Sequence, residues 1–216
     1  MIGSDAREHA LVRALSLDPM VSEVLCAPGN AGIAAEAACR PVAVTDPDDI
    51  AALAITIGAD LVVIGPESAL VSGAADAVRA RGIDCFGPSA AAARLEGSKA
   101  FAKEVMAAAG VPTARAVVCD TATEVSDALA GFAPPYVVKN DGLAAGKGVV
   151  VTRDPHEASR HAGACGRVVV EEFLDGPEVS LFAITDGRTV VPLQPAQDFK
   201  RVGEGRRCPA SSSAGG

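Results

Sequence analysis

The sequence predicts an α/β protein in which a parallel, doubly wound sheet domain is followed by a mixed α+β unit. Strand-like apolar runs alternate with helix-like segments over the first 88 residues, an order that implies parallel strands joined by right-handed crossovers. From Ser98 onward, strands are joined by short turns, with helices between pairs of strands. The chain has 216 residues, 49% of them hydrophobic, so it can bury one large core or two small ones.

The elements of the first domain follow from apolar periodicity and from residues that start or stop helices. Asp18-Pro19 ends the first helix, and residues 45–49 (TDPDD) supply an N-cap and first-turn acids for a later one. The run DLVVIG is apolar apart from its aspartate, which is typical of a strand covered on both faces. After a very short apolar start, strands are expected at residues 21–26, 41–44, 60–65 and 84–87, and helices at 6–17, from the turn at 27–30 to about 39, after 45–49, and at 69–81.

Three loops follow strands of this predicted sheet, at residues 3–7, 27–32 and 65–68. Ligands of doubly wound sheets collect at the carboxyl ends of the strands. Each loop on its own is equally well explained as ordinary turn chemistry. The three together favour a binding edge in the first domain.

The second unit begins between about Pro88 and Ser98 and is built from strand pairs and capped helices. Ser98 is expected to cap a helix that carries Lys99 and Lys103 and ends at Gly110. Further strands are expected at residues 114–120, 136–139, 148–152, 167–174 and 178–185, and further helices from the capping box Thr121-x-x-Glu124 to about Ala130 and from Asp154-Pro155.

The stretch VVKNDGLAAGKGVVV, residues 137–151, predicts a phosphate-binding loop on a β-hairpin. A P-loop needs four residues between its first glycine and a Gly-Lys pair, and then Ser or Thr on a helix. Here three residues separate Gly142 from Gly146, and Lys147 is followed by a glycine and three valines. Glycine backbone can approach a polyphosphate and point several N–H groups at it. On a hairpin, such a loop could close over ATP as a lid.

Two lysines of this stretch are candidates for phosphate binding. Lys139 ends the apolar strand YVVK. Phosphate binding explains this position of Lys139 better than the alternative, in which Lys139 is a surface lysine whose stem lies along apolar groups while its amine stays in water. For Lys147, within the loop, phosphate binding and an ordinary exposed lysine are equally well supported.

The string RVVVEEFLDGPEVS, residues 167–180, offers groups for the rest of a nucleotide. Glu171 and Glu172 end a predicted buried strand whose backbone N–H and C=O groups could bind an adenine edge. Glu178 follows after a short turn, where its carboxylate could accept hydrogen bonds from ribose hydroxyls. The alternative is two exposed acids at a strand end plus a turn. The position of the string, downstream of a lysine-bearing strand and a glycine hairpin, favours the nucleotide interpretation.

The composition argues against several classes of protein. A net charge of −8 argues against nucleic acid or an anionic membrane as the main partner, because both select for a basic face. No apolar run approaches the ~20 residues that span a bilayer, and the start MIGSDAREHA lacks the features of a signal peptide. These features predict a cytoplasmic protein. The six cysteines have no metal-ligand spacing and are expected to be reduced and mostly buried.

Several strings taken together closely resemble the phosphoribosylamine–glycine ligases, a family of the ATP-grasp superfamily. They are GSDAREHAL, CAPGNAG, IGPESALVSG, GPSAAAARLEGSK, the glycine loop, EEFLDGPEVSLFAITDG and PAQDFKRVGEG, and they run to about Glu204. The resemblance implies an α/β chain with a Rossmann-like, parallel-sheet pre-ATP-grasp domain at residues 1–97. It also implies an incomplete ATP-grasp α+β domain at residues 98–205.

The resemblance further implies a reaction and its binding residues. ATP phosphorylates the carboxylate of glycine, and the amine of 5-phosphoribosylamine then displaces phosphate to give glycinamide ribonucleotide. By family analogy, ATP is bound by Lys99, Lys139, Gly142, Gly146, Lys147, Gly148, Glu171, Glu172, Phe173, Leu174 and Glu178. The loops that shape the 5-phosphoribosylamine site contain Gly3, Arg7, Gly29, Asn30, Gly65, Pro66 and Glu67. No catalytic side chain is assigned. Mg²⁺ or Mn²⁺ is the expected metal, with the family's ligands beyond the end of this chain, and a monomer is expected.

The sequence departs from the family pattern at a few positions. In the first loop, Asp5 and Ala6 replace two glycines, which adds negative charge and removes backbone freedom where a phosphate would approach. Asn140 stands where alanine is more frequent. The tail, residues 206–216, is expected to be disordered and to lie outside the family pattern, as in a truncated chain or a shifted reading frame. The alternative function is therefore a truncated, inactive relative that at most binds nucleotide or a partner subunit.

Overall fold

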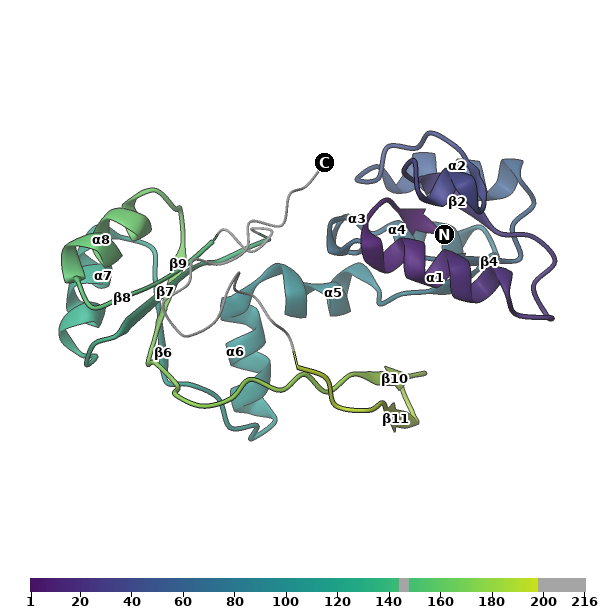
Figure 1. Ribbon diagram of the computed structural model, residues 1–216. Helices are drawn as coiled ribbons and strands as arrows, with labels where there is room; N and C mark the ends of the chain where they lie inside the picture. Colours follow the sequence, from purple (N-terminus) through teal and green to yellow (C-terminus); the bar gives the residue numbers. More distant parts are fainter. Residues whose placement is uncertain (144–147, 198–216) are drawn as a thin grey trace. The chain divides into compact units, whose positions relative to one another are not determined.

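The computed structural model describes residues 1–143 and 148–197. The chain divides into two compact units, residues 1–173 and 174–216. The first unit contains a parallel sheet near the N-terminus and an antiparallel sheet further along the chain, and the described part of the second unit is a small hairpin (Figure 1).

The first sheet is parallel throughout. Its strands are β1 (Ile2–Gly3), β2 (Leu25–Pro28), β3 (Ala38–Cys39), β4 (Leu61–Val63) and β5 (Asp84–Phe86). β2 pairs with β1 and β3, β4 pairs with β5, and a parallel bridge between Ile2 and Ile64 joins the two groups. The spatial order is therefore β3-β2-β1-β4-β5, which confirms the predicted doubly wound sheet.

Helices cover both faces of this sheet. They are α1 (Ala6–Ser16), the 3-10 helix η1 (Ile33–Ala35), α2 (Pro47–Thr56), α3 (Glu67–Ser72) and α4 (Ala74–Ala80). A further helix, α5 (Ala90–Gly97), packs against α3. Successive residues of a strand point to opposite faces. Accordingly, Cys26 packs with Val12 of α1 in one buried cluster, whereas Ala27 packs with Ile50 of α2 in another.

Four expectations about this domain were wrong. The strand expected at residues 21–26 is β2 at Leu25–Pro28, so it includes the first two residues of the expected turn at 27–30. The helix expected up to Cys39 is only η1, because the chain must extend again to pair β3 with β2. The strand expected at residues 41–44 is not formed. The helix expected at 69–81 is divided at Gly73, whose left-handed conformation (φ 97°) ends α3. The helix α5 was not expected, although Ser89 caps it by accepting the N–H of Ala92.

The second sheet is antiparallel and has the spatial order β6-β9-β7-β8. Its strands are β6 (Ala116–Cys119), β7 (Tyr136–Asn140), β8 (Val149–Thr152) and β9 (Val168–Glu171), and its helices are α6 (Lys99–Ala108), α7 (Ala122–Ala130) and α8 (Pro155–Gly163). β7 and β8 form the predicted hairpin around the glycine loop, with Lys139 opposite Val149. The expected capping box of Thr121 and Glu124 begins α7, and Ser98 caps α6.

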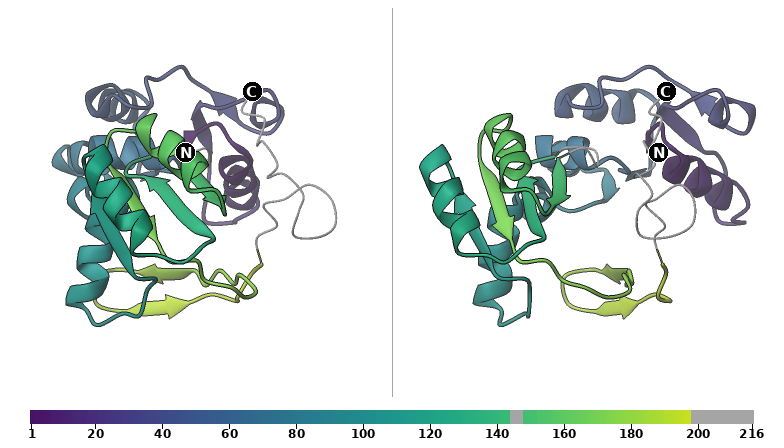
Figure 2. Two further views of the ribbon diagram at one scale, coloured as in Figure 1. Left: turned by 90° about the vertical axis from the view of Figure 1, so that its left-hand side faces the viewer. Right: turned by 60° about the vertical axis from the view of Figure 1, so that its left-hand side comes forward.

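One face of the second sheet is covered by α7 and α8, which lie side by side (Figure 2). Val138, Val168 and Val170 point to this face and pack against Val125 of α7 and Ala158 of α8. Alternation along the strands sends Val137, Lys139, Val169 and Glu171 to the opposite face. The sheet therefore has an apolar face and a face that carries charged side chains.

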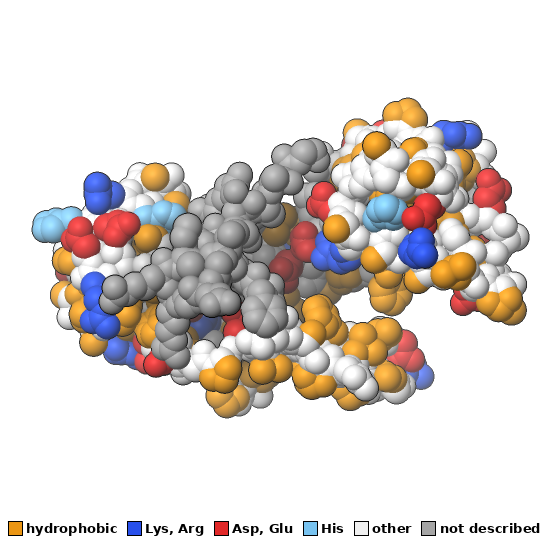
Figure 3. All heavy atoms as spheres, in the orientation of Figure 1, with side chains coloured by type: hydrophobic (Ala, Val, Ile, Leu, Met, Phe, Trp, Pro, Cys, Tyr) orange, Lys and Arg blue, Asp and Glu red, His pale blue; other side chains and the backbone are white. Residues whose placement is uncertain are grey.

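The described part of the second unit is the hairpin of β10 (Ala183–Thr185) and β11 (Val190–Pro192). The strand expected at 178–185 is shorter, with an isolated bridge between Ser180 and Ala196 before it. Hydrophobic side chains of the hairpin, including Ile184 and Val190, are exposed (Figure 3). None of the helices in the described ranges is long and apolar enough to cross a membrane.

Deleting buried volume from the apolar face of the second sheet is expected to destabilise it. Val170→Ala removes two methyl groups from a fully buried position and should lower the free energy of unfolding by about 1.5–3 kcal/mol. Val151→Ala is the matched control, because Val151 is 49% exposed, and it should cost about 0.5 kcal/mol or less. Tyr136, the one tyrosine of the chain, lies on β7, so its fluorescence during urea denaturation reports this sheet. Equal costs for both variants would contradict the assigned core.

Candidate functional site

The three loops predicted as a binding edge meet at the carboxyl ends of β1, β2 and β4. Gly29 donates its N–H to the carbonyl of Gly3 at 3.1 Å, and the side-chain amide of Asn30 donates to the carbonyl of Ser4. These bonds fix the second loop to the first. The side-chain oxygen of Asn30 also accepts the N–H of Ile33 at 2.9 Å, which starts η1.

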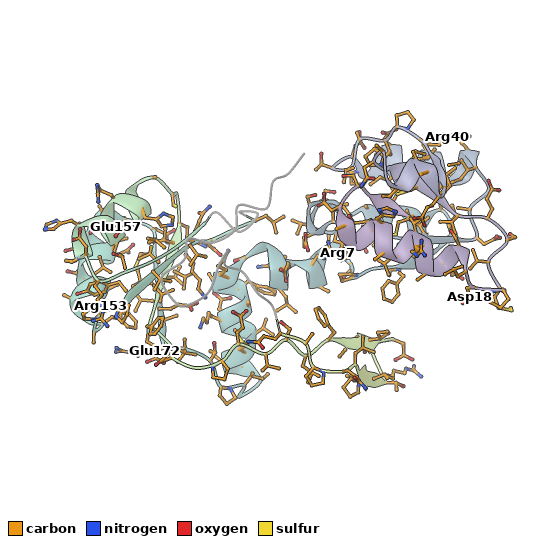
Figure 4. The ribbon with its side chains drawn as sticks, in the orientation of Figure 1. Arg7, Asp18, Arg40, Arg153, Glu157 and Glu172 are labelled. Atoms are coloured by element: carbon orange, nitrogen blue, oxygen red, sulfur yellow. The ribbon has the colours of Figure 1, made fainter. Side chains whose placement is uncertain are left out.

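Arg7 connects the first loop to the third (Figure 4). Its guanidinium donates to Glu67 Oε1 at 3.0 Å and to the carbonyl of Gly65 at 2.6 Å. Burial opposes the charge on Arg7, but hydrogen bonds and attraction from Glu67 and Glu8 outweigh burial and raise the pKa of Arg7. Burial also opposes the charge on Glu67, yet hydrogen bonds from its own backbone and from Arg7 lower the pKa of its carboxyl. Arg7 and Glu67 are therefore held as an ion pair.

Glu8 lies beneath this edge and was not predicted as a site residue. Its carboxylate accepts the N–H of Asp5 at 2.8 Å and the Nε–H of Arg7 at 3.1 Å, and the residue is 1% exposed. Asp5 is the N-cap of α1 and Glu8 is the third residue of the helix. The spacing of a capping box was therefore the sequence signal that could have identified Glu8.

Two of the predicted glycines are required by the Glu8 side chain. A Cβ at Gly3 would lie 2.5 Å from Glu8 Cγ, and a Cβ at Gly65 would lie 2.6 Å from Glu8 Cδ. Both distances are shorter than real contacts allow. Gly3 also has a φ of 128°, which side chains other than glycine rarely adopt.

A second cluster lies on the charged face of the antiparallel sheet. Lys139 and Glu171 are diagonal neighbours on β7 and β9, because Lys139 pairs with Val169 and Glu171 with Val137. The Lys139 ammonium lies 2.8 Å from Glu171 Oε2. Glu171 is 5% exposed. Lys139, which was predicted to bind phosphate, therefore forms an ion pair with a buried carboxylate in this structure.

Lys103 of α6 completes this cluster, and it was not predicted as a site residue. Its ammonium lies 3.4 Å from Glu171 Oε1. It also donates to the hydroxyl of Thr113 and to the carbonyl of Ala114, both at 2.8 Å. Nothing in the sequence near Lys103 distinguishes it from an exposed helical lysine, because Glu171 lies far along the chain.

The start of α6 is fixed to the base of the glycine loop. Ser98 donates its hydroxyl to the carboxylate of Asp141 at 3.1 Å, and the same carboxylate accepts the N–H of Ala100 at 3.1 Å. The ammonium of Lys99 donates to the carbonyl of Gly142 at 2.8 Å. The structure therefore places Lys99 at the first glycine of the loop, and its role in phosphate binding stays a prediction.

The remaining predicted nucleotide residues have different surroundings. Gly148 closes the hairpin by accepting the N–H of Asn140 at 2.7 Å. Glu172 accepts the N–H of Arg115 through its carboxylate at 2.9 Å, and Phe173 ends the first unit with 41% exposure. Leu174 and Glu178 belong to the second unit and are exposed. Gly146, Lys147 and the tail at 206–216 lie outside the described residues.

Residues 1–143 and 148–197 offer no resident metal site. Within these ranges, no group of three or more His, Cys, Asp or Glu side chains could hold a metal ion. The five cysteines described, Cys26, Cys39, Cys85, Cys119 and Cys165, are free thiols. Burial raises the pKa of Cys26, Cys85 and Cys119, as expected for unreactive cysteines.

Comparison with family models defines the class of protein first. Residues 1–96 match the N domain of phosphoribosylglycinamide synthetase, and residues 97–216 match its ATP-grasp (A) domain. A doubly wound domain followed by an antiparallel sheet with a lysine-bearing glycine hairpin thus belongs to the ATP-grasp class.

Relatives and a solved structure agree with these matches. A phosphoribosylamine–glycine ligase of Streptomyces coelicolor is 65% identical over 215 residues, covering 100% of this chain and 52% of the relative. One from Mycobacterium leprae is 58% identical over 224 residues, covering 100% and 53%. The crystal structure of phosphoribosylamine–glycine ligase from Thermotoga maritima aligns with a TM-score of 0.78 and 34% identity, covering 97% of this chain and 52% of that one. The chain belongs to the phosphoribosylglycinamide synthetase family and spans about half the length of the curated relatives it matches.

A side chain at Gly65 is expected to disturb the carboxylate of Glu8. Gly65→Ala places a methyl group where Glu8 lies, so the carboxylate must shift and lose hydrogen bonds, at a cost of about 1–3 kcal/mol in unfolding free energy. Gly163→Ala at the end of α8 is the matched control, because its Cβ would meet no atom within 4 Å. It should be neutral or stabilise by up to about 1 kcal/mol. Urea denaturation followed by circular dichroism measures both, and an unchanged Gly65→Ala midpoint would refute the packing of Glu8.

Proposed function

We propose that this chain provides nucleotide- and phosphoribosylamine-binding parts of an ATP-dependent ligase. The reaction joins glycine to 5-phosphoribosylamine and yields glycinamide ribonucleotide, ADP and phosphate. The observation that carries the proposal is the family match over residues 1–96 and 97–216, because both descriptions name phosphoribosylglycinamide synthetase. Since the chain spans about half of its relatives, the complete reaction is proposed for the protein that carries this chain. We infer a first domain at residues 1–97 and part of an ATP-grasp domain at 98–205.

The proposed chemistry requires no nucleophile from the protein. A glycine carboxylate oxygen attacks the terminal phosphorus of ATP, and ADP leaves, which gives glycyl phosphate. The amine of 5-phosphoribosylamine then attacks the glycyl carbonyl, phosphate leaves, and the amine loses a proton. Positioning and charge neutralisation supply most of the catalysis in such transfers.

The charged face of the antiparallel sheet is the proposed site for the phosphates of ATP. Lys139 and Lys99 would neutralise the phosphates, and the glycine loop from Gly142 to Gly148 would cover them. Two ammonium groups lie within 3.4 Å of the one Glu171 carboxylate, so this cluster keeps a net positive charge. Residues 171–174 would line adenine, and Glu178 would accept hydrogen bonds from ribose.

The edge formed by the first three loops is the proposed site for 5-phosphoribosylamine. The residues assigned to it are Gly3, Arg7, Gly29, Asn30, Gly65, Pro66 and Glu67. Arg7 is paired with two carboxylates, Glu67 and Glu8, so this trio is net negative. That charge favours the amine and hydroxyl groups of the substrate over its phosphate.

Mg²⁺ or Mn²⁺ is the metal proposed to accompany ATP, and it would neutralise phosphate charge. The side chains of residues 1–143 and 148–197 do not fit a metal site. The roles proposed for this chain are therefore limited to its lysines, backbone N–H groups and carboxylates.

Removing either proposed phosphate lysine is expected to weaken ATP binding. Lys139→Ala and Lys99→Ala should each raise the dissociation constant of ATP about tenfold or more, because each removes a charge-assisted phosphate contact. Arg153→Ala removes an exposed cation at the end of β8 and should leave the constant within about twofold. Isothermal titration calorimetry with ATP and Mg²⁺ measures all three. Equal affinities for the wild type and both lysine variants would rule out these phosphate ligands.

The ligation itself is tested by ADP formation in the protein that carries this chain. Release of ADP should depend on both glycine and 5-phosphoribosylamine, because phosphoryl transfer needs the carboxylate and turnover needs the amine. Glycinamide ribonucleotide should appear in equal amount and can be detected by mass spectrometry. Release of ADP that is independent of either substrate would contradict the proposed reaction.

A further inference from the structure

The two lysines that contact Glu171 are held in different ways. Lys103 has three partners, namely Glu171 at 3.4 Å, the hydroxyl of Thr113 and the carbonyl of Ala114. For Lys139, Glu171 is the one partner among the described residues. The side chain of Lys103 is 16% exposed and that of Lys139 is 30% exposed. Lys139 can therefore move away with the loss of one contact, whereas Lys103 cannot.

From this difference we infer that Lys103 is a positioning residue that keeps Glu171 neutralised while Lys139 turns toward a phosphate of ATP. The inference rests on the proposed nucleotide site and assigns Lys103 a role that is separate from contact with the nucleotide. Lys103 stays beside the Glu171 carboxylate in both states. Lys139 contacts that carboxylate when the site is empty and contacts a phosphate when ATP is bound.

Because Glu171 is buried, its carboxylate needs a cation that stays beside it when Lys139 moves. Its side chain is 7% exposed, and a buried carboxylate that loses its only cation is strongly destabilised. Without Lys103, each movement of Lys139 toward a phosphate would leave Glu171 unpaired. With Lys103 in place, Glu171 keeps one cation in both states, so the movement of Lys139 to a phosphate costs the Lys139–Glu171 contact but does not leave a buried carboxylate unpaired.

The geometry of α6 separates the roles of its two lysines. Residues four apart on a helix lie on the same face, and Lys99 and Lys103 both point toward the sheet. Lys99 donates to the carbonyl of Gly142 at the base of the glycine loop, whereas Lys103 reaches Glu171 on β9. The bonds from Lys103 to Thr113 and Ala114 also fix it to the segment before β6. Lys103 is therefore placed to serve Glu171 and Lys99 to serve the loop.

The test compares ATP binding by the full chain in four variants. Lys103→Met should weaken ATP binding about tenfold or more, because Lys139 becomes the only cation of Glu171. Lys103→Met combined with Glu171→Gln should return affinity to within about threefold of Glu171→Gln alone, because a neutral amide needs no cation. Lys103→Met combined with Glu104→Gln is the matched control and should stay weak, because Glu104 is an exposed carboxylate of α6 outside the proposed nucleotide site and is not the partner of Lys103 or Lys139. Calorimetry with ATP and Mg²⁺ gives the affinities, and circular dichroism confirms folding.

Each other outcome of this test decides against the inference. If Lys103→Met binds ATP as the wild type does, Lys103 has no positioning role, although the nucleotide site stands. If Glu171→Gln does not restore binding, Lys103 acts through direct contact with the nucleotide or through folding alone.

A second measurement needs no nucleotide. The rate at which acetic anhydride acetylates Lys139, relative to Lys99 in the same sample, is measured by peptide mass spectrometry. Lys103→Met should slow the labelling of Lys139 several-fold, because the Lys139 amine is then the one cation beside Glu171 and is held in its charged, unreactive form. If the wild type binds no ATP, the proposed function fails, and this ratio still decides whether Lys103 shares the neutralisation of Glu171 with Lys139. A ratio unchanged by Lys103→Met overturns it.

Discussion

A carboxylate that is removed from water must keep cations and hydrogen-bond donors around it, and this constraint shapes both candidate sites. Within residues 1–143 and 148–197, Glu8 and Glu171 are the buried charged side chains. Glu8 holds Arg7 and the N–H of Asp5, so that it joins the start of α1 to the loop after β4 through Arg7. Glu171 draws lysines from β7 and from α6. The residues proposed to bind ligands are arranged around these two acids.

Much of the fold is determined by local patterns and was predictable for that reason. Runs of β-branched valines predict β7 and β9, the short glycine-containing connection predicts the β7–β8 hairpin, and Thr121 and Glu124 predict the start of α7. The errors lie where tertiary pairing overrides local preference. β3 forms at Ala38–Cys39 because β2 offers it a parallel partner, and the residues before it have helix-forming side chains that would otherwise continue η1. Such pairing is not visible in a single window of sequence.

The candidate sites were predictable to a different extent. Sequence spacing was enough to place Arg7, Asn30 and Glu67 at one edge, because all three follow strands of a parallel sheet. It was also enough to place Lys139 near the end of a strand of the glycine hairpin. Glu8 was missed although its capping-box spacing from Asp5 is a local signal. Lys103 was missed because its role depends on contact with Glu171, which lies far along the chain. A residue that acts through another residue leaves little trace in its own neighbourhood.

The two sites carry opposite local charge, although the chain as a whole has a net charge of −8. Such a chain repels a polyphosphate at long range, so binding must depend on cations that act at short range within the site. Two ammonium groups brought together for that purpose would repel each other. Glu171 lies between Lys103 and Lys139 and contacts both, so its negative charge offsets their repulsion while one positive charge remains. A buried acid within the proposed phosphate site is therefore compatible with anion binding, because it allows two lysines to lie close together there.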